Sequence, residues 1–291
     1  MTLSLAMLLA SMAAFWILSR PQVLPAEDYQ NLVGDLSNGE RIFWAAGCSS
    51  CHADPMAKGE DKLVLSGGYR IDSPFGAFIA PNISPGSAGI AGWTTYDFAN
   101  ALVAGVSPKG QHIYPSLPYT TYARMNPEDV ADLKAFIDSL PVSDVPSRPH
   151  ELRFPFNIRR GLGLWKRLNL RRDWVVTEVA TPQLQRGRYL VEALGHCAEC
   201  HTPRNIIGGL DTRRWMQGAP NPSGKGDIPA ISADKLDWSA GDIAYYLETG
   251  FTPDFDSAGG QMAKVVLGTA KLSSEDREAI AAYLKISSLV D

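Results

Sequence analysis

The sequence predicts an all-α fold in which two copies of a small helical domain follow an N-terminal transmembrane helix. Three observations support this prediction. The pentapeptide C-x-x-C-H occurs twice, at residues 48–52 and 197–201, and the segments around it repeat as well. Residues 2–18 contain no charged side chain, as in a membrane span. The 20 prolines and 26 glycines among 291 residues indicate many loops rather than extended sheet.

The N-terminal segment reads TLSLAMLLASMAAFWIL and, at 17 residues, is at the short end for a membrane span. Trp16 would lie near the interface, with Arg20 just beyond it. A cleaved signal peptide is the alternative, but a basic n-region is absent and residues 24–26 (Leu-Pro-Ala) are a weak cleavage site. We therefore expect a membrane anchor, or else a signal, over residues 1–24, and either one would export the rest of the chain.

The two C-x-x-C-H motifs are typical of covalent c-type haem attachment. Two cysteine thioethers fix the porphyrin, and the adjacent histidine binds the iron as its proximal ligand. Disulfides, a thioredoxin-like pair and a four-cysteine zinc site are the alternatives, but none of them needs a histidine after the second cysteine. The motifs use all four cysteines, so the sequence predicts two covalently bound haem c groups and no disulfide. The predicted attachment residues are Cys48, Cys51, His52, Cys197, Cys200 and His201.

The segments before the motifs predict a helix in each copy. Residues 39–47 and 187–195 carry apolar side chains at helical spacing and lead directly into the cysteines. Gly47 and Gly195 are expected to end these helices. The repeat divides the chain into a first domain (30–141), a connector (142–186) and a second domain (187–291).

Two further helices are predicted in each domain. The middle helices should begin after the N-caps Thr94 and Ser239 and end at Gly105 and Gly250. The closing helices, residues 126–137 and 273–284, each begin with a cap followed by acids in the first turn. Crossing of the first and closing helices would bury Phe136 and Tyr283 against Phe43 and Val191.

The connector is strongly basic in a chain whose formal net charge is −4. Residues 148–172 contain eight basic side chains and one acid, with apolar and aromatic residues between them. This mixture suits docking on phospholipid head groups or on a partner subunit. The alternative is pairing with haem propionates and with acids of the two domains. The basic residues are Arg148, Arg153, Arg159, Arg160, Lys166, Arg167, Arg171 and Arg172.

Several phrases match a known group of proteins. Residues 80–85 read APNISP, residues 105–119 run from GVSP to YPSLPY, and residues 187–205 run from GRYLVE to HTPRN. On these phrases and Gly92-Trp93 the chain resembles, over residues 35–288, the multihaem cytochrome c subunits of membrane-bound bacterial dehydrogenases that oxidise alcohol, gluconate and related sugars or aldehydes. The resemblance implies two tandem class I cytochrome c domains. Similar subunits carry three haems, whereas this chain has two motifs.

The distal ligand of the second haem is predicted to be Met262, because a methionine thioether is a common second ligand in electron-transfer haems. The resemblance places the ligand here, before the closing helix, and the preceding glycines suggest a loop. A core methionine is the alternative reading, and Met216 is the competing ligand.

The first haem departs from the family pattern, since Leu117 stands where similar subunits have methionine. Met125 is the nearest replacement, although it could instead be a hydrophobic staple against the closing helix. Met56 is too close to His52 to reach the opposite face, and His112 is expected only to form hydrogen bonds. A five-coordinate first haem is the remaining alternative.

The resemblance implies an electron-transfer protein rather than an enzyme, anchored by its N-terminal helix in the bacterial cytoplasmic (inner) membrane with its haem domains in the periplasm. Such a protein would pass electrons in a respiratory chain, between a dehydrogenase or quinol and a downstream cytochrome or terminal oxidase. The alternative is a haem enzyme of the peroxidase or thiosulfate-oxidising type with an open first haem. The mildly acidic composition argues against a nucleic-acid partner.

Overall fold

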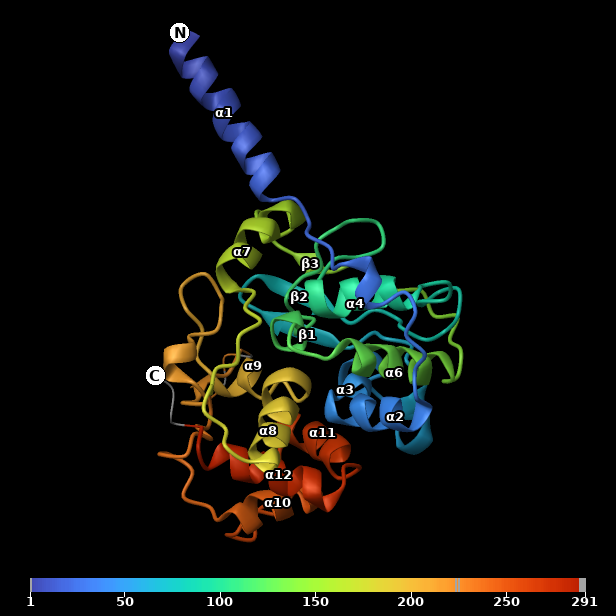
Figure 1. The fold of residues 1–291 in the computed structure, drawn as a ribbon, viewed down its shortest axis with the longest axis vertical. Helices are drawn as coiled ribbons and strands as arrows, with labels where there is room; N and C mark the ends of the chain where they lie inside the picture. Colours follow the sequence, from blue (N-terminus) through green and yellow to red (C-terminus); the bar gives the residue numbers. More distant parts are fainter. Residues whose placement is uncertain (1, 223, 225, 288–291) are drawn as a thin grey trace.

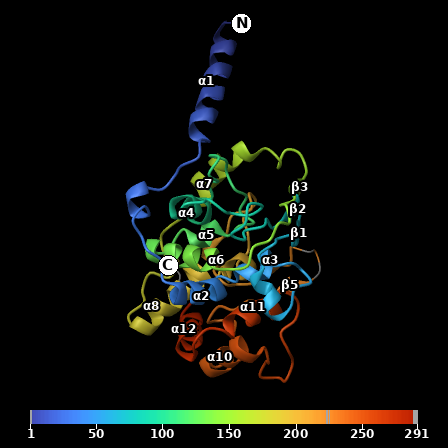
Figure 2. The ribbon, with the colours of Figure 1, turned by 90° about the vertical axis from the view of Figure 1, so that its right-hand side faces the viewer.

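The computed structural model describes residues 2–287 except 223 and 225. Two helical domains lie side by side, and one long helix projects away from them (Figures 1 and 2). The first domain contains α2 (Leu36–Ala45), α3 (Cys48–His52), α4 (Thr95–Ala104), α5 (Tyr119–Tyr122) and α6 (Pro127–Asp138). The second contains α8 (Pro182–Tyr189), the π-helical η4 (Leu190–Leu194), α9 (Ala198–His201), α10 (Ala240–Thr249), α11 (Gly260–Thr269) and α12 (Ser274–Leu284).

Two small antiparallel sheets accompany the helices, so the fold is mainly helical rather than entirely helical as predicted. In the first sheet, β2 (Gly76–Ile79) lies between β1 (Arg70–Ser73) and β3 (Glu151–Leu152). Because β3 belongs to the connector, the connector completes a sheet of the first domain. The second sheet pairs β4 (Ala219–Pro220) with β5 (Asp227–Ile228). Short 3₁₀ segments complete the fold: η1 (Ala26–Asp28), η2 (Gly59–Leu63), η3 (Arg159–Gly161) and η5 (Thr212–Arg214).

The first and last helices of each domain cross very closely. A Cβ at Gly39 of α2 would lie 2.1 Å from the carbonyl oxygen of Asp132 on α6. At the matching crossing, a Cβ at Gly187 of α8 would lie 2.0 Å from the carbonyl oxygen of Ala279 on α12. Glycine at the same place in both copies therefore sets how near the helices approach.

The core is one cluster of buried apolar residues that runs through both crossings. The rings of Phe43 and Phe136 lie 5.3 Å apart. Val191 and Tyr283 are fully buried in the same cluster. The predicted burial is thus confirmed for Tyr283, whereas Phe136 packs against Phe43 but is only partly buried.

The middle helices begin and end as predicted. Thr94 and Ser239 each accept a hydrogen bond from the backbone of an aspartate three residues on, and that aspartate accepts one in return. Gly105 and Gly250 end the helices in the left-handed conformation, with φ of 60° and 79°. At the closing helices Ser273 accepts a cap hydrogen bond, whereas Asn126 forms none with its side chain.

The predicted N-terminal transmembrane helix was wrong. Helix α1 (Thr2–Leu18) has 17 residues and ends before Ser19. At 1.5 Å per residue its length is about 25 Å, less than the roughly 30 Å of a hydrocarbon core. Over the described part of the chain, no helix is both long enough and apolar enough to span a membrane.

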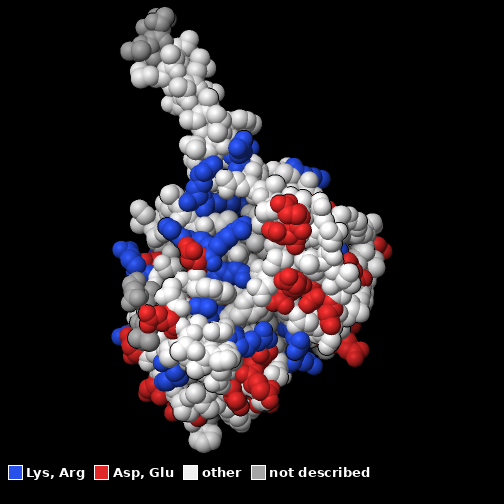
Figure 3. Space-filling view, viewed as in Figure 1, with Lys and Arg blue, Asp and Glu red and all other residues white. Residues whose placement is uncertain are grey.

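Connector arginines bind the C-terminal end of α1, where helical carbonyl groups lack partners. Arg160 donates hydrogen bonds to the Trp16 carbonyl (2.5 Å) and the Ser19 hydroxyl (2.9 Å), and its guanidinium lies over the Trp16 ring. Arg167 donates to the Leu18 carbonyl (2.6 Å). Basic residues accordingly gather beneath α1 (Figure 3). The sequence analysis did not predict that connector arginines would cap this helix.

Lys166 joins the connector helix α7 (Leu162–Asn169) to the first domain. Its ammonium is buried and donates hydrogen bonds to the carbonyls of Ala104 (2.8 Å) and Gly105 (2.5 Å) at the end of α4. Burial lowers the pKa of Lys166 to about 7. The connector is therefore fastened to the first domain rather than being a loose linker.

Candidate functional site

The first motif follows a left-handed glycine. Helix α2 ends at Ala45, Gly47 adopts φ of 61°, and α3 then places Cys48, Cys51 and His52 on one short turn. The positive φ requires little strain at glycine and lets the chain reverse directly into the cysteines. The predicted role of Gly47 is confirmed.

The second motif reaches the same arrangement differently. Its helix continues as a π-helix (Leu190–Leu194), and Gly195 has a φ of −72°. The left-handed residue is instead His196, with φ of 42°. Gly195 therefore ends the helix, as predicted, but without adopting a left-handed conformation. The wider π turn shifts the reversal by one residue, and such turns often occur at functional sites.

All four cysteines are unpaired in the structure, so each motif presents two thiols. Burial raises the pKa of the Cys48 and Cys197 thiols to about 12, so both are neutral thiols. Among the described residues no cluster of three or more His, Cys, Asp or Glu side chains could hold a metal ion.

Each motif histidine is oriented by a proline carbonyl. His52 Nδ1 lies 2.9 Å from the Pro81 oxygen, and His201 Nδ1 lies 2.7 Å from the Pro229 oxygen. A carbonyl oxygen only accepts hydrogen bonds, so Nδ1 carries the proton and Nε2 keeps its lone pair. Burial also lowers the pKa of both histidines and keeps them neutral. Both imidazoles are therefore prepared to bind iron through Nε2.

A glycine holds each proline loop against its histidine. The Gly67 amide donates to the His52 carbonyl (2.7 Å), and the Gly218 amide donates to the His201 carbonyl (2.8 Å). Both glycines have positive φ, 77° and 80°. A Cβ would lie 2.5 Å from the Pro81 carbonyl carbon at Gly67, and 2.8 Å from the Ile228 carbonyl oxygen at Gly218.

These proline loops are functional elements that the sequence analysis missed. Residues 81–84 read PNIS and residues 229–232 read PAIS, so Pro-x-Ile-Ser follows the histidine by 29 or 28 residues. Both terminal serines are fully buried. This short internal repeat is the signal that would have identified the loops.

Polar side chains suited to haem propionates lie beside the second motif. A hollow of about 280 Å³ is lined by side chains of the first domain, the connector and the second domain. Arginine guanidinium groups bind carboxylates well because their donors form a rigid fork. The arginines that line the hollow are Arg124, Arg171, Arg204 and Arg213. The thiols, the oriented histidines and these arginines all fit haem c.

The predicted second-haem ligand lies in a helix rather than in the loop that was expected. Met262 is half-buried in the first turn of α11, because Gly259 and Gly260 begin that helix. Its competitor Met216 is fully buried, and its backbone bonds Thr202 and the loop after Pro229. Met216 is thus tied to the loop that holds His201, which favours a core role.

The candidates near the first haem also have defined environments. Met125 is buried in the core cluster, directly before α6. Met56 is 81% exposed. His112 donates a hydrogen bond through Nε2 to the Ser19 carbonyl (2.8 Å), because a carbonyl oxygen can only accept. His112 therefore forms a hydrogen bond, as expected. Ligation by Met125 and by Met262 remains a prediction.

The two motifs face each other across the domain interface. His196 lies beside Gly47 and hydrogen-bonds the Ala46 carbonyl, which also accepts from the Tyr122 hydroxyl (3.1 Å). Cys51 and Cys200 lie close enough that an ionised Cys200 would raise the pKa of Cys51. Two haems on these cysteines would consequently be neighbours.

Helix α11 of the second domain packs on the first motif. The Ser50 hydroxyl lies 3.5 Å from the Lys264 carbonyl, and the Lys264 ammonium lies over the ring of Tyr69. The Gln261 amide donates to the Tyr69 hydroxyl (2.5 Å). The helix that carries Met262 therefore contacts both domains.

Known proteins show similarity over nearly the whole chain. Residues 36–141 and 184–288 match the family model described as cytochrome c. A protein of Cereibacter sphaeroides described as "Diheme cytochrome c-type" is 58% identical over 286 residues, which are 98% of this chain and 97% of the relative.

Two dehydrogenase subunits are more distant relatives. The fructose dehydrogenase cytochrome subunit of Gluconobacter japonicus is 36% identical over 258 residues, covering 86% of this chain and 52% of the relative. The gluconate 2-dehydrogenase cytochrome c subunit of Pantoea cypripedii is 30% identical over 266 residues, covering 86% and 59%. The chain thus spans little more than half the length of these subunits.

Proposed function

This chain belongs to the cytochrome c family, and we propose that it passes electrons from a dehydrogenase to a downstream electron acceptor. It carries two haem c groups, one on each C-x-x-C-H motif. The observation that supports an electron carrier best is the matched support of the two motif histidines by Pro81 and Pro229.

When bound, each haem supplies an iron that gains or loses one electron. The residues of the chain perform the remaining tasks. The cysteines anchor the ring, and the proline carbonyl holds the Nδ1 proton of the histidine, which fixes the imidazole and increases its basicity. Gly67 and Gly218 keep those carbonyls in place. A rigid site of this kind suits electron transfer because little has to move when the charge changes.

Contacts between the domains hold the two motifs together. Glu199, inside the second motif, accepts a hydrogen bond from the Thr120 hydroxyl of the first domain (2.6 Å) and pairs with Arg204 (2.6 Å). Behind it, the buried Glu192 pairs across the interface with Arg124 of the first domain (3.9 Å). Within its own half of the chain, Glu192 is held by hydrogen bonds from the Tyr283 hydroxyl (2.6 Å) and the Val175 amide (2.6 Å). These bonds support a fixed distance between the haems and electron passage from one to the other.

The names of the relatives support the choice of donor. Both distant relatives are cytochrome subunits of dehydrogenases, which favours a dehydrogenase over quinol as the electron source. We place the haem domains in the bacterial periplasm. The uncharged segment of residues 2–18 and the two covalent attachment motifs support export.

Purification of the tagged full-length protein from its native cells tests this proposal. A dehydrogenase subunit should be recovered with it, and adding the substrate of that enzyme should reduce both haems. The matched control is the double variant Cys197→Ser and Cys200→Ser, which should retain the enzyme but reduce only one haem. Recovery without any dehydrogenase, or oxidation of a substrate by the purified chain alone, would contradict the proposal.

A further inference from the structure

A small loop of the second domain displays an aromatic side chain in a strained backbone conformation. Phe255 has φ of 62° and is 96% exposed. The loop itself is well fixed, because the Thr252 amide donates to the Asp256 carbonyl (2.9 Å) and the Phe255 amide donates to the Thr252 carbonyl (3.0 Å). Residues other than glycine, asparagine and aspartate rarely adopt this conformation. Phe255 is therefore held outward by a rigid turn.

The first domain contains the same loop and shows what the fold alone requires. Both loops follow the glycine that ends the middle helix, and each is closed by an isolated bridge, Val106 with His112 or Phe251 with Ser257. The residue that corresponds to Phe255 is Gly110, with φ of 68°. Glycine at this position is therefore sufficient to form the turn. Phenylalanine at the same position adds backbone strain without adding buried contacts. Strained residues of this kind tend to occur where they serve a function.

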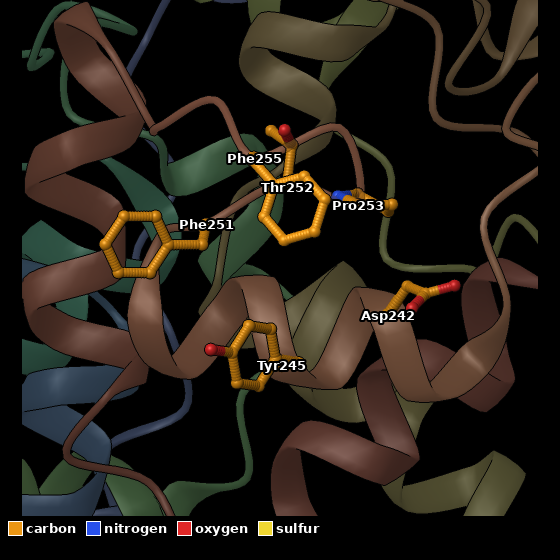
Figure 4. Close-up of a pocket in the computed structure, with 6 residues that line it drawn as sticks. All are labelled: Asp242, Tyr245, Phe251, Thr252, Pro253 and Phe255. Atoms are coloured by element: carbon orange, nitrogen blue, oxygen red, sulfur yellow. The ribbon is translucent and has the colours of Figure 1, made fainter.

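Two other exposed aromatic side chains accompany Phe255. Tyr245 of α10 is 55% exposed and Phe251 is 52% exposed. Together with Asp242, Thr252 and Pro253, the three rings surround a hollow of about 410 Å³ (Figure 4). Aromatic residues are enriched at the centres of protein interfaces, where they supply much of the binding energy.

The segment of the chain that carries these aromatic residues contains acidic but no basic side chains. Residues 236–263 contain no lysine or arginine. Glu248 forms an ion pair with Arg277 (3.0 Å), whereas Asp254 and Asp256 form no salt bridge with any described residue. Asp254 and Asp256 flank Phe255 and are exposed. The acids of the segment are Asp237, Asp242, Glu248, Asp254 and Asp256.

We propose that Tyr245, Phe251 and Phe255 form a docking surface for a protein partner whose apolar contact is surrounded by lysine and arginine. The acids would attract the basic rim of the partner, and Phe255 would insert into its apolar centre. In keeping with the proposed function, the partner is an oxidant that takes one electron from a ferrous haem of this chain, with no bond made or broken. The same acids would repel an anionic lipid surface.

The test measures binding between fully oxidised proteins, so it does not depend on electron transfer. The probe is a cationic monohaem cytochrome c, titrated at low ionic strength into the holoprotein and its variants. Phe255→Gly, which introduces the residue of the first-domain loop, should weaken binding by about tenfold. The double variant Asp254→Asn and Asp256→Asn should weaken binding and reduce its salt dependence. Val33→Ala, at another highly exposed apolar residue, is the control and should bind normally.

Several results would overturn the proposal. Wild-type protein that does not bind the probe, or Phe255→Gly protein that binds it as tightly as wild type, would do so. So would sedimentation showing that Phe255→Gly converts a dimer into a monomer, because the occupant would then be a second copy. If binding is lost while dehydrogenase-dependent reduction of both haems persists, the docking surface is supported independently of the electron source.

Discussion

Replacing Gly67 by alanine should raise the reduction potential of the first haem. The new Cβ would lie 2.5 Å from the carbonyl carbon of Pro81, about 0.9 Å inside an ordinary contact of 3.4 Å. Pro81 must therefore move, and its 2.9 Å hydrogen bond to His52 Nδ1 would lengthen beyond hydrogen-bonding range. The imidazole then becomes a weaker donor to iron, which disfavours the ferric state.

The expected shift follows from the value of one hydrogen bond. A net hydrogen bond contributes about 1 kcal/mol. A tenfold change in a one-electron equilibrium corresponds to 59 mV, so loss of the bond should raise the potential by up to about 40 mV, the value reached if the bond stabilises only the ferric state. Alanine at positive φ also costs about 1–2 kcal/mol of folding free energy. The melting temperature should therefore fall by several degrees.

A spectroelectrochemical titration of both haems measures the effect. Gly59→Ala is the matched control, because Gly59 also has positive φ, 55°, but has no atom within 4 Å of an added Cβ. It should lower stability without changing either potential. Gly218→Ala should shift the second haem instead of the first. Equal potentials in the Gly67→Ala and Gly59→Ala proteins would refute the reasoning.

Three further predictions concern other parts of the site. Met262→Leu should remove the His/Met spectral signature from one haem and leave both haems attached, whereas Met216→Leu should preserve it; an unchanged Met262→Leu spectrum would exclude this ligand. Glu192→Gln should lower the free energy of unfolding by about 1–3 kcal/mol in denaturant titrations, because it disrupts buried hydrogen bonds, and the exposed Glu178→Gln should not. The pKa of Lys166 is lowered to about 7 in the folded protein, so above that pH the unfolded chain binds more protons than the folded one. The free energy of unfolding should therefore rise towards pH 10. Lys166→Met should flatten this rise in melting experiments.

Much of the fold could be predicted because the signals for where helices begin and end lie in short stretches of sequence. The internal repeat shows each of these signals twice. The caps at Thr94 and Ser239 and the glycine ends at Gly105 and Gly250 depend only on neighbouring residues, and all four are confirmed. The packing of Phe136 against Phe43 followed from helical spacing.

The structure differs from the predictions where contacts between residues far apart in the chain, or a helix length close to a limit, determine the outcome. The bonds from His52 to Pro81 and from His201 to Pro229 join residues far apart in the chain, so they were not foreseen. Gly195 ends its helix as predicted, but the π-helix before it and the left-handed conformation of His196 were not foreseen. The N-terminal segment was predicted to span a membrane although its 17 residues are at the short end of the range, and the described helix is no longer than that.

The most direct test of the central claim is rapid mixing of the holoprotein with its copurified dehydrogenase and substrate. We expect both haems to be reduced, and then reoxidised when a cationic monohaem cytochrome c is added, with one electron delivered per haem. Protein whose haems stay oxidised in the presence of the working dehydrogenase would contradict the account. So would haems that are reduced but cannot pass their electrons to any added acceptor.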